Sequence, residues 1–189
     1  MSHRVCPWWV GYFLLNPFRK RGQNPHKTLS PYVREGMTVL EPGPGMGFFT
    51  LELARLVGES GRVVCVDVQA KMIEKLKTRL AKEGLSSRVD TRVAAADCMG
   101  LADLRGVVDF TLAFYAVHEF PDAARFFAEV AESSKPGATL LLAEPRGHVK
   151  PSLFEEQLQA AVRAGFKVTG RPAIRRSQTA VLEKDVGHL

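Results

Sequence analysis

The sequence has little cysteine and no long hydrophobic run. Its 189 residues include three cysteines at wide spacing, without a Cys-x-x-Cys pair: Cys6, Cys65 and Cys98. An odd, scattered set excludes a disulfide framework and predicts no metal site, so we expect a reducing, cytoplasmic setting. The longest early apolar stretch, 7–15, is too short to cross a bilayer and no Ala-x-Ala-like cleavage site follows it. We therefore predict neither a transmembrane segment nor a signal peptide.

The sequence also lacks internal repeats, low-complexity tracts and a strong excess of one charge. It has 26 Lys and Arg against 20 Asp and Glu, a net charge of +6. This balance permits an anionic substrate or nucleic acid without requiring either. A chain of this length fits one domain with a single sizeable core.

What is present is a regular alternation of strand and helix patterns. Strands are predicted at 38–41, 62–67, 88–94, 107–114, 138–143, 166–169 and 178–183, and helices at 48–56, 70–83, 122–134 and 152–164. Pro136-Gly137 is predicted to form a turn, and Ser152 with Glu155 a capping box that opens the last helix. The order predicts an α/β, Rossmann-like three-layer sandwich: a mostly parallel sheet with helices on both faces.

A glycine-rich loop follows the first predicted strand. Gly43, Gly45 and Gly47 lie between strand and helix, where glycine permits a sharp turn and a close approach to a ligand. A tight turn without a ligand would use the same residues. The dinucleotide fingerprint needs glycine at position 48, which is Phe48, so a phosphate-cradling nicotinamide oxidoreductase is a weaker alternative.

Acidic residues end the neighbouring predicted strands. Asp67 follows the glycines by about 20 residues, where a carboxylate can accept hydrogen bonds from both hydroxyls of a ribose. Its alternative role is to cap the next helix. Asp97, with Cys98 beside it, follows the third strand and could accept from an adenine amino group, or could be an ordinary loop aspartate. In a parallel sheet these strand ends meet at one edge.

These segments, in their order and spacing, resemble the class I S-adenosylmethionine-dependent methyltransferases over about 38–183. The matching segments are the Glu-x-Gly-x-Gly-x-Gly loop, the acidic end of the second strand, Ala-Ala-Asp-Cys, and Ser-Lys-Pro-Gly-Ala-Thr-Leu-Leu-Leu. The resemblance implies a seven-stranded sheet whose last strand is antiparallel, and S-adenosyl-L-methionine as cofactor. It implies these contacts: Glu41, Gly43, Gly45 and Gly47 at the methionine end, Asp67 with Val68 at the ribose, Asp97 and Cys98 at the adenine, and the backbone near Phe114 at the amino group.

The chain is most similar to the small-molecule, ubiquinone/menaquinone methyltransferase-like members. The likeness rests on Val-Asp-Val-Gln-Ala-Lys-Met at 66–72 and Ala-Val-His-Glu-Phe-Pro-Asp at 116–122. It implies a small-molecule acceptor, without carrying over quinone specificity. Methylases of nucleic-acid or protein amino groups resemble one another in an Asn/Asp-Pro-Pro-aromatic motif that this chain lacks after its fourth strand. A catalytically silent cofactor-binding regulator would have the same cofactor residues and stays open.

Methyl transfer is an in-line displacement that depends mainly on alignment, so a general base is optional. His118, Tyr115 and Glu144 are the candidate catalytic residues because they follow the fourth and fifth predicted strands. His118 could also contact the acceptor. Alternatively, His118 forms a structural hydrogen bond, and Glu144 forms an internal ion pair with Arg146.

Residues 1–30 are predicted to be an aromatic lid and basic linker ahead of a catalytic core at 31–189, within a single methyltransferase domain. Trp9 and Tyr12 are the candidate acceptor contacts. The same aromatic residues could instead cover the sheet. Together with the basic residues 19–21 they also leave peripheral membrane contact open.

Overall fold

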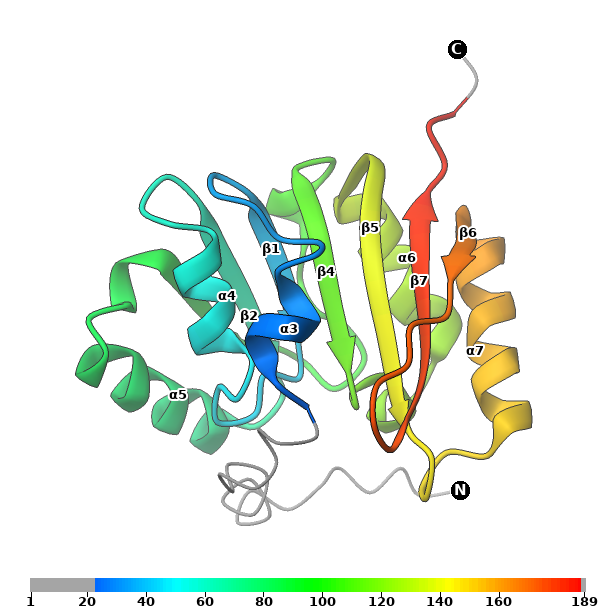
Figure 1. The fold of residues 1–189 in the computed structure, drawn as a ribbon, viewed down its shortest axis with the longest axis horizontal. Coiled ribbons are helices and arrows are strands. Elements are labelled where there is room, and N and C mark those ends of the chain that lie inside the picture. The colour runs from blue at the N-terminus through cyan, green and yellow to red at the C-terminus, as the bar shows by residue number, and fades with distance from the viewer. Residues whose placement is uncertain (1–22, 188–189) are drawn as a thin grey trace.

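The computed structural model describes residues 23–187, which form one seven-stranded sheet (Figure 1). The strands are β1 (Thr38–Pro42), β2 (Arg62–Asp67), β3 (Val89–Val93), β4 (Val108–Phe114), β5 (Ser134–Pro145), β6 (Phe166–Gly170) and β7 (Ser177–Lys184). Their order is β3-β2-β1-β4-β5-β7-β6. The pairs from β3 to β5 are parallel, and β7 is antiparallel to both β5 and β6. The predicted fold class, with its antiparallel last strand, is confirmed.

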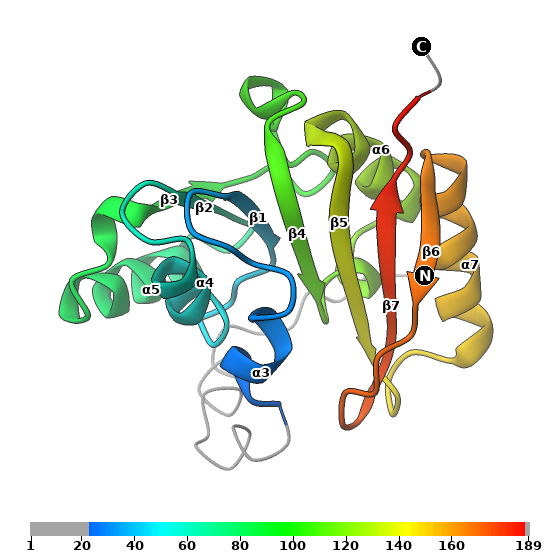
Figure 2. The ribbon, with the colours of Figure 1, turned by 45° about the horizontal axis from the view of Figure 1, so that its top comes forward.

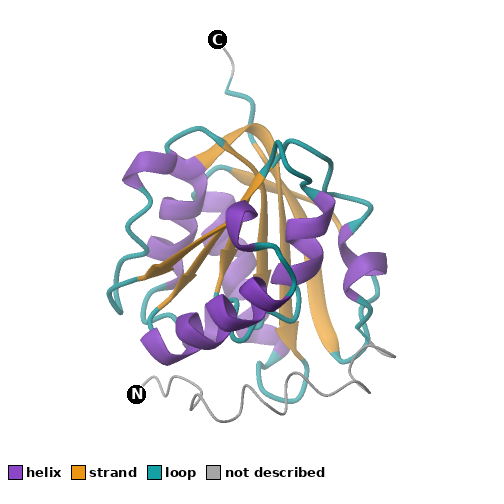
Figure 3. Ribbon diagram, turned by 90° about the vertical axis from the view of Figure 1, so that its left-hand side faces the viewer, coloured by secondary structure: helices purple, strands orange, loops and turns teal. Residues whose placement is uncertain are grey.

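Helices cover both faces of this sheet (Figure 3). They are α3 (Pro25–Leu29), α4 (Thr50–Leu56), α5 (Ala70–Lys82), α6 (Ala123–Ser133) and α7 (Pro151–Arg163), with 3-10 turns at Ser86–Arg88, Ala102–Leu104 and Val117–Glu119. Alternate residues of β4 face opposite layers. Phe110 and Leu112 pack with α3, α4 and α5, whereas Ala113 packs with α6 and α7. The central strands are buried on both faces, as crossover helices require.

Helix α5 shows how the sequence pattern produces this packing. Met72, Ile73, Leu76 and Leu80 recur every three or four residues and are the buried residues of the helix. The polar residues between them lie on the opposite, solvent-facing side. This amphipathic face holds the β2–β3 crossover against the sheet.

Three local predictions were wrong at element ends. Helix α4 begins at Thr50, two residues later than predicted. Strand β5 begins at 134, so Pro136-Gly137 forms an irregularity within the strand, where the register with β4 shifts, and not a turn before it. Helix α7 has no capping box, because Pro151 occupies its first turn after the cap residue Lys150. Glu155 pairs with Arg171 instead.

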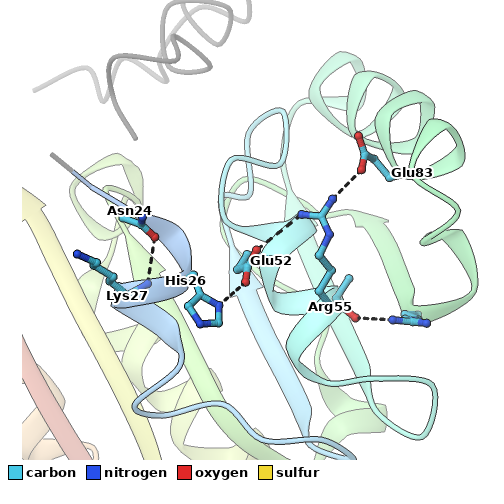
Figure 4. A network of polar contacts seen from close by, with 8 residues as sticks. Asn24, His26, Lys27, Glu52, Arg55 and Glu83 are labelled. Atoms are coloured by element: carbon cyan, nitrogen blue, oxygen red, sulfur yellow. Dashed lines mark hydrogen bonds and ion pairs between the residues drawn. The ribbon is translucent and has the colours of Figure 1, made fainter. Parts of the chain in front are cut away.

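Surface ion pairs join the helices on one face (Figure 4). Asn24 caps α3, His26 lies 2.8 Å from Glu52 of α4, and Arg55 lies 2.6 Å from Glu83 at the end of α5. Exposed pairs of this kind contribute about 0–1 kcal/mol each. The His26–Glu52 contact joins α3 to α4, while Leu29 at the end of α3 is fully buried and supplies the packing.

The predicted lid with Cys6, Trp9 and Tyr12, and the start of the basic linker at 19–22, lie outside the described residues. The rest of the predicted linker is not a simple connection, because Pro25–Leu29 form α3 and Leu29 is buried in the core. Among residues 23–187, none of the helices has both the length and the apolar character that a membrane crossing needs.

Candidate functional site

A cavity of about 220 Å³ opens at the carboxyl ends of β1, β2 and β4. Strand order reverses between β1 and β4, which is where parallel α/β sheets bind ligands. The carboxyl ends of β4 and β5 and the β6–β7 loop share this edge of the sheet (Figure 2). The cavity is lined by residues from four segments of the chain and by Met72 of α5. The first two segments are 41–49, without Gly47, and 66–69; the other two supply Ala94 and Ala96, and Leu112, 114–116 and 119–121.

The three glycines of the first loop all have positive φ, from 54° to 81°. A Cβ at Gly43 would lie 3.1 Å from Cβ of Ala116, and one at Gly47 would lie 2.5 Å from Cδ1 of Leu76. Gly45 has no atom within 4 Å of that position and lines the cavity. Gly43 and Gly47 are therefore needed for packing, whereas Gly45 keeps the ligand side of the loop open.

Glu41 ends β1 as a buried carboxyl group in the cavity wall. Its Oε2 accepts a 2.6 Å hydrogen bond from the hydroxyl of Thr50 and lies 3.5 Å from Sγ of Cys65. Burial raises the pKa of Glu41 to about 7, although the hydrogen bonds from Thr50 and Cys65 oppose that rise. Near neutral pH this group is ready to ionise when a cation approaches it.

Asp67 ends β2 and joins two loops of the cavity wall. Its carboxylate accepts the backbone N–H of Gln69 at 2.9 Å, and the amides of Gly45 and Val68 also donate to it. Burial raises the pKa of Asp67, and these backbone hydrogen bonds partly counteract the rise. The N-cap residue of α5 is Gln69. Asp67 therefore does not occupy the helix-cap position that was the alternative to its ribose role.

Asp97 and Cys98 lie beyond the lining of this cavity. The Asp97 carboxylate is exposed and lies 3.3 Å from the guanidinium of Arg125 on α6, and Sγ of Cys98 lies 3.8 Å from Glu129. Ala94 and Ala96 line the cavity in their place. Ala94 and Ala96 were not predicted from the sequence, because small apolar side chains carry no chemical signal of their own.

The end of β4 supplies an aromatic wall. The ring centroids of Phe49 and Phe114 are 4.4 Å apart, and those of Phe114 and Tyr115 are 4.5 Å apart. Tyr115 has a φ of 61°, unusual for a residue with a side chain. Its hydroxyl lies 2.7 Å from Oγ of Ser177 and accepts from Nε2 of Gln23 at 2.5 Å. Phe114 and Tyr115 both line the cavity. The hydroxyl of Tyr115 is held at Ser177, the first residue of β7.

His118 and Glu144 are brought together beside the cavity, although neither lines it. Nδ1 of His118 lies 2.5 Å from Oε2 of the fully buried Glu144, and the backbone N–H of His118 donates to Oε1 at 3.2 Å. Burial lowers the pKa of His118, but the hydrogen bond and charge of Glu144 outweigh it and raise that pKa overall. Arg146 donates from Nε to the carbonyl of Ser177, so the expected Glu144–Arg146 ion pair does not form.

Residues 33–186 match a family described as methyltransferase domain. The chain belongs to this family. Among curated relatives, the ubiquinone/menaquinone biosynthesis C-methyltransferase of Klebsiella pneumoniae is 30% identical over 112 residues, which is 59% of this chain and 44% of the relative. That of Francisella philomiragia is 28% identical over 121 residues, 64% and 48% of the two chains. The chain thus spans less than half the length of the curated relatives it matches.

A solved structure extends the likeness to nearly the whole chain. The S-adenosylmethionine-dependent methyltransferase from Aquifex aeolicus has a TM-score of 0.83 and 26% identity, covering 95% of this chain and 98% of its own. The chain is a class I methyltransferase domain, and its cofactor is S-adenosylmethionine.

The cavity of this methyltransferase domain fits that cofactor. Of the three acidic residues that line the cavity, Glu41 and Asp67 suit an ammonium group and a ribose, and Glu119 lies after β4, while Gly45 leaves room for a ligand at the loop. The remaining wall is largely apolar, as the thioether and adenine portions require. In the part of the chain that the structure describes, no cluster of side chains suits a metal ion.

Proposed function

We propose that this methyltransferase domain transfers the methyl group of S-adenosylmethionine to a small-molecule acceptor. The observation that carries the proposal is the joint presence of Glu41, Asp67 and an unobstructed Gly45 in one cavity. The curated relatives, which are quinone-biosynthesis C-methyltransferases, support a small-molecule acceptor.

We infer the following roles for the cofactor contacts. Glu41 and the three glycines surround the methionine end; the pKa of Glu41 is about 7, and an ammonium group beside it favours the ionised carboxylate. Asp67, beside Val68, accepts from the ribose hydroxyls, and the backbone at Phe114 contacts the amino group. When bound, the cofactor supplies an electrophilic methyl group on a sulfonium. The rings of Phe49, Phe114 and Tyr115 exclude water from that region and present π faces, each worth about 0.5–2 kcal/mol toward a cation.

The adenine side has two candidate sets of residues. The side chains of Ala94 and Ala96 suit an apolar ring face. The sequence expectation that Asp97 and Cys98 contact the adenine remains a proposal, and it requires Asp97 to exchange its contact with Arg125 for the ligand.

For acceptors that must lose a proton, we propose His118 as the proton acceptor and Glu144 as the residue that positions it. Nδ1 faces Glu144, which leaves Nε2 as the nitrogen that receives the proton. The pKa of His118 is raised above its ordinary value of 6.5. Activity that uses neutral His118 as a base therefore increases as pH rises through this raised pKa. Tyr115 is proposed to orient the acceptor, and Trp9 and Tyr12 to cover it.

The test is transfer of labelled methyl from S-adenosylmethionine to separated fractions of a cell extract. We expect label in the small-molecule fraction, with none in RNA, DNA or protein. Label found only in the RNA, DNA or protein fraction would show that the acceptor is a macromolecule and would contradict the small-molecule proposal. Cofactor binding without transfer to any fraction would favour a cofactor-binding regulator.

A further inference from the structure

Three arginines meet at the edge of the sheet where the cavity opens. Arg146 follows β5, while Arg175 and Arg176 precede β7. Because β7 runs antiparallel to β5, Pro145 pairs with Ser177 and the two strand ends coincide. The backbone N–H of Arg146 donates to the carbonyl of Arg176 at 3.0 Å, and its Nε donates to the carbonyl of Ser177 at 2.9 Å. We refer to Arg146, Arg175 and Arg176 as the arginine rim.

The arginine rim adjoins the cavity through Tyr115. The hydroxyl of this cavity residue lies 2.7 Å from Oγ of Ser177 and 3.5 Å from the carbonyl oxygen of Arg176. Gln23 bridges the same junction, donating to the Tyr115 hydroxyl and to the carbonyl of Arg175 at 3.3 Å. One hydrogen-bonded junction therefore joins the β4 side of the cavity to the rim.

Within residues 23–187, no acidic side chain pairs with the arginines of the rim. All three side chains belong to exposed residues, and no ion pair formed within residues 23–187 includes any of them. By contrast, Arg92 pairs with two aspartates and Arg171 with Glu155. Arg175 and Arg176 are consecutive, and the backbone of Arg146 is hydrogen-bonded to that of Arg176, so three positive charges belong to one stretch of this edge and all attract an anion bound there.

The charged residues that line the cavity are acidic, in contrast to the rim beside it. Glu41 and Asp67 lie at the ends of β1 and β2, and Glu119, which also lines the cavity, follows β4; the rim lies at the end of β5 and the start of β7. In the strand order, Glu41 and Asp67, which suit the cationic cofactor, lie on one side of β4, and the exposed arginines lie on the other side, where the acidic Glu144 is buried and paired with His118. A ligand on the arginine side is favoured when it is negatively charged.

We propose that the acceptor is a small molecule with an anionic oxyacid group, a carboxylate or a phosphate monoester, bound by the arginine rim. This inference rests on the proposed function and names the substrate class of the same site. Guanidinium forks match the paired oxygens of both groups, and charge-assisted hydrogen bonds of this kind are the strong ones. The anionic group anchors the acceptor beside Tyr115.

The experiment uses the full chain saturated with S-adenosylhomocysteine and titrates it with benzoate, phenyl phosphate and the neutral analogue benzamide. Binding is followed by calorimetry and by the NMR signals of arginine Nε–H groups. We expect at least one anion to bind about tenfold or more tightly than benzamide, with shifts at the rim. The tighter of the two anions identifies the carboxylate or the phosphate as the recognised group.

The variant Arg175→Gln/Arg176→Gln is expected to weaken anion binding about tenfold or more while leaving the affinity for S-adenosylhomocysteine unchanged. Arg163→Gln is the matched control, because Arg163 is exposed and lies at the end of α7. Equal binding of benzoate, phenyl phosphate and benzamide would overturn the proposal, as would equal losses in the double variant and the control.

A single-stranded RNA oligonucleotide is titrated in parallel. RNA that binds far more tightly than either small anion, and loses that affinity in the double variant, would replace the small acceptor by a nucleic acid. Failure of the unmodified chain to bind S-adenosylhomocysteine would instead contradict the proposed function, and comparing benzoate with benzamide would still test the rim.

Discussion

At the scale of single residues, Asp67 and Asp97 differ in environment, although Asp67 ends β2 and Asp97 follows the neighbouring strand β3. Asp67 is a cavity residue with backbone donors, whereas Asp97 is exposed and paired with Arg125. We expect Asp67→Ala to weaken S-adenosylmethionine binding by about 1.5–3 kcal/mol, a tenfold to hundredfold loss, because charged hydrogen bonds are removed. Calorimetry measures the effect, with S-adenosylhomocysteine as a second ligand.

Asp97→Ala is the matched control for this measurement. We expect it to change the affinity much less than Asp67→Ala, since its side chain is directed to Arg125. If the two variants lost equal affinity, the adenine role expected for Asp97 from the sequence would be supported. An unchanged affinity in Asp67→Ala would contradict the ribose role.

Glu41 predicts a pH dependence of stability without ligand. Its pKa is about 7 in the folded protein against an ordinary value of 4.5, so the folded state binds the extra proton between these values. Stability from this group is therefore lost as pH rises from about 4.5 to 7, a decrease of about 2–3 kcal/mol. Glu41→Gln removes this decrease, and urea unfolding across that pH range measures it.

The same carboxyl group predicts how cofactor affinity changes with pH. Ionised Glu41 attracts the ammonium group of the cofactor, so affinity is expected to increase from about pH 5.5 to 7.5, with proton release on binding. In Glu41→Gln the amide can still accept from Thr50, but the increase should disappear. A wild-type affinity that does not change with pH would rule out an ionising contact between Glu41 and the cofactor.

At the scale of elements, the His118–Glu144 contact joins the segment after β4 to the end of β5. The pKa of His118 is raised, so the contact contributes stability that is full below pH 6.5 and is lost as pH rises through the folded-state pKa. Glu144→Gln should therefore destabilise the protein more in mildly acidic than in alkaline solution. Thermal unfolding at several pH values provides the measurement.

Glu156→Gln is the control for that series, because Glu156 is an exposed residue of the neighbouring helix α7. We expect Glu156→Gln to leave the pH dependence of thermal stability unchanged. A Glu144→Gln variant whose destabilisation is the same at every pH would show that Glu144 acts through packing or neutral hydrogen bonding, not through its charge on His118.

At the scale of the whole molecule, residues 23–187 contain a seven-stranded sheet and two hydrophobic clusters. We therefore expect a chain without residues 1–18 to stay folded and to bind S-adenosylmethionine at least weakly. It should lose most methyl transfer if the aromatic segment is a lid that excludes water. Circular dichroism, calorimetry and labelled-methyl transfer test the three statements.

Two outcomes of this truncation would contradict the lid. An aggregated product would mean that the aromatic residues cover apolar surface of the sheet. A folded product with normal transfer would mean that the segment has no part in the reaction. The longer deletion of residues 1–23 provides a comparison, because it also removes the contacts of Gln23 with Tyr115 and Ser177.

Local patterns in the sequence were sufficient to predict most strands and helices and part of the cavity lining. Strand β2 was predicted residue for residue, since a short apolar run between turn residues has few alternatives. Glu41, Asp67, Gly43 and Gly45 line the cavity at the edge expected from the sequence, because parallel strand ends meet there whatever the details of packing, whereas Gly47 packs against Leu76.

Only the tertiary structure decided which side chains meet. Asp97 pairs with an arginine 28 positions away, Glu144 contacts His118 in place of Arg146, and the arginine rim exists because Pro145 and Ser177 share a register position. Such contacts depend on strand order and rotamers set by long-range packing, which local periodicity does not encode. The sequence alone therefore determined the strand–helix order and the cofactor edge, while the fold determined the partners of its charged residues.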